Sequence, residues 1–135
     1  TMNIIPDFDD VAADFPKLKI IMLHHAEGRD EDACLITRHK GNVFREVSGM
    51  WPEYYEVNVP RMWYEMNRRQ QDKYMFGSEY NLFPLDGILY QHLQKDYREG
   101  ILEKLFWKNT IRILGEDFER VGVNLKEWKQ NLEEV

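Results

Sequence analysis

Chemically reactive side chains occur in this sequence at three places where an apolar run gives way to glycine. They are His24-His25-Ala26-Glu27-Gly28, Ser48-Gly49 and Gly77-Ser78-Glu79-Tyr80. In proteins built on parallel strands, reactive groups gather where strands end and the following loops begin. Imidazole and carboxylate groups at such ends can transfer protons or bind a metal ion. The spacing therefore indicates a site without specifying its reaction.

Each candidate residue also has a simpler interpretation. His24 either binds metal or transfers protons near neutral pH, or it only bonds to a backbone carbonyl. His25 alternates to the other side of the strand, so we expect it away from the site. Glu27 is either a helix-start carboxylate or a pocket group. Glu79 is either catalytic or a group of the N-cap type.

The elements that position these residues follow from apolar runs and helical periodicity. Strands are expected over 19–24, 42–48 and 73–76. Helices are expected over 30–40, from about 59 with Pro60 in the first turn, over 85–95, over 99–114 with Gly115 as C-terminal cap, and over 125–135. Alternating strands and helices predict an α/β fold with a parallel sheet.

A parallel sheet of this size is incomplete by itself. Both of its edges would be open, and too little apolar surface would be covered. We therefore expect further strands from another polypeptide.

The composition narrows the class of protein. The chain has 135 residues, 43% hydrophobic and 31% charged, which suits one globular domain over residues 1–135. Its net charge of −6 disfavours nucleic-acid binding. No apolar run reaches the roughly 20 residues of a membrane span, so no membrane association is expected. The single cysteine, Cys34, fits a buried thiol and a reducing cytoplasm.

Four segments resemble motifs of the amidohydrolase-related family that includes aminocarboxymuconate-semialdehyde decarboxylase and the resorcylate decarboxylases. Residues 14–28 (DFPKLKIIMLHHAEG) resemble its sixth-strand motif. Residues 42–49 (NVFREVSG) resemble the seventh, usually N-V-Y-x-D-x-S, and residues 74–80 (YMFGSEY) resemble the eighth, usually ending G-(S/T)-D-(Y/W)-P. Residues 108–115 (KNTIRILG) are similar to the closing helix, and order and spacing agree from about residue 9 to residue 115.

The resemblance implies a fold and two roles. The fold is the C-terminal portion of a TIM-type (β/α)8 barrel, strands six to eight and their helices, because a whole barrel takes about 250 residues. His24 would assist proton transfer, as the family's strand-six histidine does. Glu79 stands where the family has an aspartate that binds metal and accepts a proton. Glutamate is one methylene longer, so Glu79 is expected as a catalytic residue and, with reduced fit, as a metal ligand. Asn81 stands where the family has proline.

The family's other metal ligands, a His-x-His pair on strand one and a histidine on strand five, have no counterpart here. His39 and His92 lie in helical patterns and are expected at the surface or in packing. We therefore expect a divalent metal, zinc first, where another polypeptide supplies the missing strands, and no competent metal site on this chain alone. An oligomer is expected.

The implied reaction is metal-assisted hydrolysis or nonoxidative decarboxylation of a small aromatic or unsaturated carboxylic substrate. Glu27, Ser48, Trp51 and Tyr80 are the expected substrate contacts. For Trp51, lining a pocket and packing on the barrel are equally open, whereas Trp63 is expected to pack. The alternatives are a noncatalytic scaffold subunit or degenerate paralogue without metal, and a metal-independent hydrolase.

Overall fold

The computed structural model describes residues 4–26, 28–127 and 130, with the side chains of residues 4–6 left out. One parallel sheet lies at its centre, in the order β1-β2-β3. Its strands are β1 (Ile20–Met22), β2 (Val43–Glu46) and β3 (Tyr74–Met75). Ile20 pairs with Val43, and Arg45 pairs with Tyr74. The expected parallel α/β sheet is confirmed, with strands shorter than the apolar runs that predicted them.

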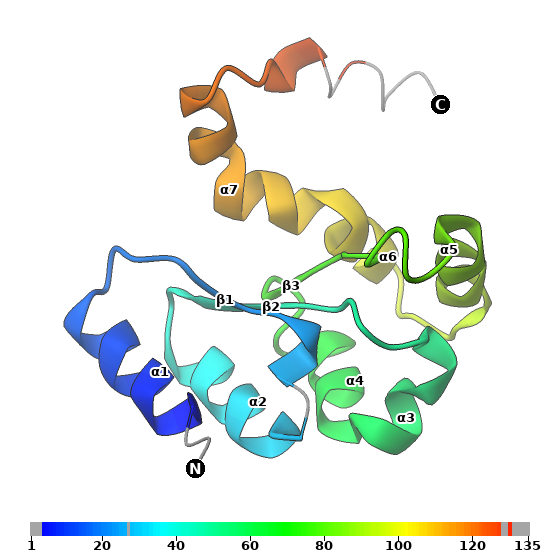
Figure 1. The fold of residues 1–135 in the computed structure, drawn as a ribbon, viewed down its shortest axis with the longest axis horizontal. Helices are drawn as coiled ribbons and strands as arrows, with labels where there is room; N and C mark the ends of the chain where they lie inside the picture. The colour runs from blue at the N-terminus through cyan, green and yellow to red at the C-terminus, as the bar shows by residue number, and fades with distance from the viewer. Residues whose placement is uncertain (1–3, 27, 128–129, 131–135) are drawn as a thin grey trace.

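Helices cover both faces of this sheet (Figure 1). In that view α1 (Ile4–Asp14), α2 (Asp30–His39), α3 (Tyr55–Asn58) and α4 (Pro60–Met66) lie on one side and α7 (Asn109–Arg120) on the other. The other helical segments are two 3-10 turns, η1 (His24–Ala26) and η2 (Pro52–Tyr54), α5 (Leu85–Gln94), α6 (Ile101–Glu103) and the π-helix η3 (Lys104–Lys108). No helix in the described part of the chain is long and apolar enough to span a membrane.

The helices expected over 30–40, from about 59 and over 85–95 are confirmed, and Pro60 occupies the first turn of α4. Helix α1 was not expected. The segment predicted over 125–135 is described only at 125–127 and 130, where it is helical, and its other residues lie outside the described chain.

Alternation along the strands divides the core into two layers. Ile20, Met22 and Val43 pack with residues of α1 and α2. On the opposite face, Phe44 and Met75 pack against Ile113 of α7. The face bearing Phe44 would be the interior of a closed barrel, and here α7 covers it.

The predicted helix end at Gly115 is wrong. The helix runs on to Arg120, and Gly115 is buried within it. A Cβ at Gly115 would lie 3.3 Å from Leu125 Cδ1, so close packing, and not a left-handed cap, explains this glycine.

The expectation that both sheet edges are open is also wrong, since the edge at β3 is closed. Phe76 N–H donates to Leu105 O at 2.9 Å, and Asn109 Nδ2 donates to Tyr74 O at 2.8 Å. These partners lie in and next to the π-helical turn, a helical irregularity that leaves backbone groups free for other bonds. Among the described residues, no strand pairs with the outer edge of β1.

Candidate active site

The ends of β1 and β3 bring His24 and Glu79 together. His24 Nε2 lies 2.9 Å from Glu79 Oε1, and their side chains are 48% and 28% exposed. Parallel strands end at the same edge of a sheet, which explains why residues 55 positions apart in sequence can meet. The expected juxtaposition of these residues is observed, and both carry polar atoms that solvent can reach.

His24 lies in an unusual turn and not at the end of an extended strand. β1 ends at Met22, and η1 follows with φ values of 53° for His24, 57° for His25 and 57° for Ala26. Left-handed backbone costs a non-glycine residue roughly 1–2 kcal/mol. The surrounding structure must therefore stabilise this turn.

His25 lies away from the site, as expected, although the turn and not strand alternation places it there. Its side chain is buried, and its ring contacts the Tyr55 ring with centroids 5.5 Å apart. Burial, assisted by the positive charge of Arg45, lowers the pKa of His25 to about 3. His25 is thus a neutral packing residue at physiological pH.

Glu46 is a site residue that the sequence reasoning missed. Its Oε2 accepts a hydrogen bond from Ser48 Oγ at 2.8 Å and a long one from His24 N–H at 3.5 Å. A Cβ at Gly77 would overlap the Glu46 carboxylate, so glycine is required for this packing. The available signal was the seventh-strand motif, which has an aspartate where Glu46 stands.

A second glycine accommodates His24. Gly49 has a φ of 79°, and a Cβ there would lie 3.1 Å from the Cγ of His24. Gly77 and Gly49, each from one of the reactive segments, therefore leave room for a carboxylate and an imidazole.

The expected substrate contacts are not all gathered at the His24–Glu79 pair. Ser48 reaches it through Glu46. Trp51 packs edge-on against Phe83, with ring centroids 5.3 Å apart, and Tyr80 is 72% exposed. Glu27 lies outside the described residues. Trp63 packs against the Tyr97 ring, as expected, with centroids 4.9 Å apart.

The loop after β3 has its own backbone constraint. Glu79 has a φ of 52° and Asn81 a φ of 98°. Proline is restricted to a φ near −65°, so the family's proline cannot adopt the conformation of residue 81 in this chain.

The remaining histidines are not part of the site. His92 is fully buried, and its Nδ1 lies 2.7 Å from Tyr97 Oη, whereas His39 is exposed. Burial, together with the charge of Lys95, lowers the pKa of His92 to about 4. The expectation of surface or packing roles is confirmed for both.

The donor set of the described residues does not fit a catalytic metal. No three histidine, cysteine or acidic residues in the described chain are grouped to hold an ion. His24 and Glu79 bond to each other, and Glu46 already accepts from Ser48. A catalytic zinc typically takes three protein ligands, so the part of the chain that the structure describes falls short.

Comparisons with known proteins agree with the geometry. A family model described as amidohydrolase matches residues 1–115. An uncharacterized TIM-barrel protein of Bordetella bronchiseptica is similar in structure, with 22% sequence identity and a TM-score of 0.69. The match covers 82% of this chain and 39% of that one, so the chain spans about two fifths of that barrel protein. No curated protein matches the chain. The fold is part of a TIM barrel, and the chain belongs to the amidohydrolase family.

Proposed function

We propose that this chain contributes an acid/base pair, His24 and Glu79, to an amidohydrolase-like active site. The observation that carries the proposal is the 2.9 Å contact between His24 Nε2 and Glu79 Oε1 at the exposed ends of β1 and β3. A carboxylate that bonds one ring nitrogen orients the imidazole and favours one tautomer, which suits His24 for proton transfer. Glu46 and Ser48 support the pair from β2.

The reaction we propose is hydrolysis, or nonoxidative decarboxylation, of a small aromatic or unsaturated carboxylic substrate. Both reactions need a proton moved at a defined atom, and an imidazole bonded to a carboxylate at an exposed position is suited to that step. Family membership supports hydrolytic chemistry in general, and the choice between these reactions rests on the resemblance alone.

A second polypeptide segment that supplies further strands is part of the proposal. The unpaired outer edge of β1 supports it, because such an edge offers backbone groups to an incoming strand. A divalent metal, zinc first, is proposed only for that assembly, in which other strands would supply the missing ligands and Glu79 one donor. An oligomer is proposed because the three-stranded sheet is only part of a barrel. A reducing cytoplasm is proposed because the one cysteine, Cys34, is a free and buried thiol.

The test is turnover by the full assembly of a panel of aromatic and unsaturated acids and their amides. His24→Gln and Glu79→Gln should each reduce kcat about a hundredfold, the usual effect of removing an acid/base group. Arg69→Gln, a change in an exposed side chain far from the pair, is the matched control. Metal content of the chain alone and of the assembly, measured on the same samples, tests the metal.

The alternative is a noncatalytic scaffold, favoured by the shortage of metal ligands among the described residues. It predicts that both site variants leave the turnover of the assembly unchanged. That result would remove the proposed function.

A further inference from the structure

The left-handed turn at residues 24–26 is contacted by two consecutive residues of β2. Arg45 and Glu46 point to opposite faces of the sheet, as neighbours on a strand do. Glu46 accepts from the N–H of His24, and Arg45 Nη2 donates to the carbonyl of His25. The turn is thus held from both faces of the sheet.

Arg45 is itself rigidly held. Its side chain is fully buried, its Nη1 lies 2.9 Å from Cys34 Sγ, and its Nη2 lies 3.1 Å from Asp30 Oδ1. Its guanidinium carbon also lies 5.6 Å from the centre of the Tyr74 ring. A planar guanidinium with several occupied donors keeps one orientation, so the bond to His25 O has a fixed direction.

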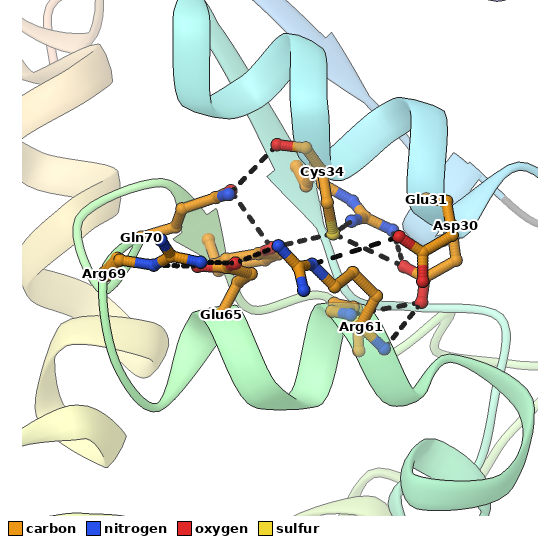
Figure 2. Close-up of polar contacts among 10 residues, drawn as sticks. Asp30, Glu31, Cys34, Arg61, Glu65, Arg69 and Gln70 are labelled. Atoms are coloured by element: carbon orange, nitrogen blue, oxygen red, sulfur yellow. Dashed lines mark hydrogen bonds and ion pairs between the residues drawn. The ribbon is translucent and has the colours of Figure 1, made fainter.

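Asp30 connects Arg45 to α4. Its Oδ2 accepts from the backbone N–H groups of Arg61 and Met62, at 3.0 and 3.1 Å, in the first turn of α4. Figure 2 shows Asp30 and Cys34 on α2 facing α4, on which the side chain of Arg61 is directed toward Glu65. Arg45 is therefore held by α2 directly and by α4 through Asp30, in addition to its bond to the turn.

We propose that Arg45 is a positioning residue that imposes the left-handed turn and thereby brings His24 to Glu79. Left-handed backbone at consecutive non-glycine residues persists only where surrounding contacts determine it. The side chains of Arg45 and Glu46 each bond the backbone of the turn. That Arg45 matters for catalysis rests on the proposed function. That Arg45 imposes the turn rests on geometry alone.

The experiment is NMR of the full chain, following the ring Cε1–H signal of His24. The difference in this signal between the native chain and Glu79→Gln reports the His24–Glu79 contact. In an Arg45→Lys background this Glu79-dependent difference should be lost, because a lysine ammonium cannot reproduce the directed guanidinium bonds. Arg69→Lys is the matched control, since Arg69 pairs with the buried Glu65 and does not touch the turn, and it should keep the difference.

A rescue variant separates positioning from general damage. Ala26→Gly removes the penalty for left-handed backbone at one position of the turn, because glycine adopts positive φ freely. Combined with Arg45→Lys it should restore at least part of the Glu79-dependent difference. If Arg45→Lys acted only by weakening the fold in general, Ala26→Gly would not restore the Glu79-dependent difference.

Two results would overturn the proposal. One is a full Glu79-dependent difference in Arg45→Lys. The other is an unchanged difference in Asp30→Asn, the variant to use if Arg45→Lys does not fold, as judged by the NMR signal of the buried His92. Asp30→Asn keeps the volume of the side chain but removes the charge that orients Arg45. A reduced difference supports the proposal, and an unchanged one overturns it.

The readout needs no turnover, so the two proposals fail separately. If His24 depends on Arg45 in this way but the assembly variants keep full activity, the proposed function is lost and the positioning role remains.

Discussion

Two polar clusters use similar residue types on opposite faces of β2. The exposed cluster, His24, Glu46, Ser48 and Glu79, lies at the strand ends. The buried cluster, Asp30, Cys34, Arg45, Arg61 and Glu65, lies between β2, α2 and α4. The exposed cluster has a half-exposed ion pair, whereas the side chains of Arg45 and Glu65 are fully buried.

The two clusters therefore differ in how much the stability of the fold depends on them. A half-exposed ion pair contributes about 0–1 kcal/mol, so the exposed cluster can change at small cost to folding. A charge left unpaired in the interior costs several kcal/mol, so the buried cluster must remain intact. The chain thus keeps its reactive groups where the fold depends on them least.

The largest expected effect comes from acid, through the buried histidines that contrast with His24. The pKa values of His25 and His92 are lowered from 6.5 to about 3 and about 4. The contribution of these two neutral histidines to the free energy of unfolding is therefore complete above about pH 6.5. It is lost as the pH falls toward their pKa values in the folded chain. The loss should be on the order of 5 kcal/mol at pH 4, because between about pH 6.5 and pH 4 the unfolded chain binds up to two more protons than the folded chain.

Urea unfolding at a series of pH values measures this loss. His92→Phe keeps an aromatic ring. It should reduce the slope of the free energy of unfolding against pH by the amount that one bound proton contributes. Stability that is constant between pH 6.5 and pH 4 would contradict the burial of these histidines.

The next largest effect is expected in the buried cluster. Arg45→Met leaves Asp30 without its buried cation and should lower the free energy of unfolding by about 3–5 kcal/mol. Arg69→Met is the control, and it should cost much less because solvent reaches Arg69 and Arg61 still pairs with Glu65. Equal losses in the two variants, measured by urea unfolding, would show that the burial of Arg45 does not set its contribution to stability.

A smaller effect is expected where the exposed cluster packs on glycine. Gly77→Ala forces the Glu46 carboxylate, the end of a flexible side chain, to move and should cost about 1 kcal/mol, the low end of the range for an added methyl group. Gly41→Ala is the control, since nothing lies within 4 Å of a Cβ there. The double variant Gly77→Ala, Glu46→Ala should recover much of the loss. No recovery would mean that the collision with Glu46 is not its cause.

The smallest effect is expected for the ion pair itself. Glu79→Gln should change the free energy of unfolding by less than about 1 kcal/mol, because solvent reaches both partners. Thermal and urea unfolding measure it, with Glu65→Gln in the buried cluster as the contrasting variant. A large loss at Glu79 would show that the exposed cluster also maintains the fold.

Parts of this arrangement could be predicted because they depend on local pattern. Apolar runs ending in polar residues predicted parallel strands, and such strands place His24 and Glu79 at one edge. Other parts depend on distant contacts that no short pattern contains. The role of Glu46 requires the β2–β3 register that sets it against Gly77, and the closed edge at β3 requires a π-helical turn near Asn109. Gly115 was misread because a helix-ending glycine and a close-packing glycine look alike in sequence.

The backbone angle of Asn81 restricts which residues position 81 can hold. Proline is compatible only with a negative φ, whereas asparagine also tolerates the left-handed region in which residue 81 lies. Proline at position 81 would therefore force the loop that carries Glu79 out of its present conformation.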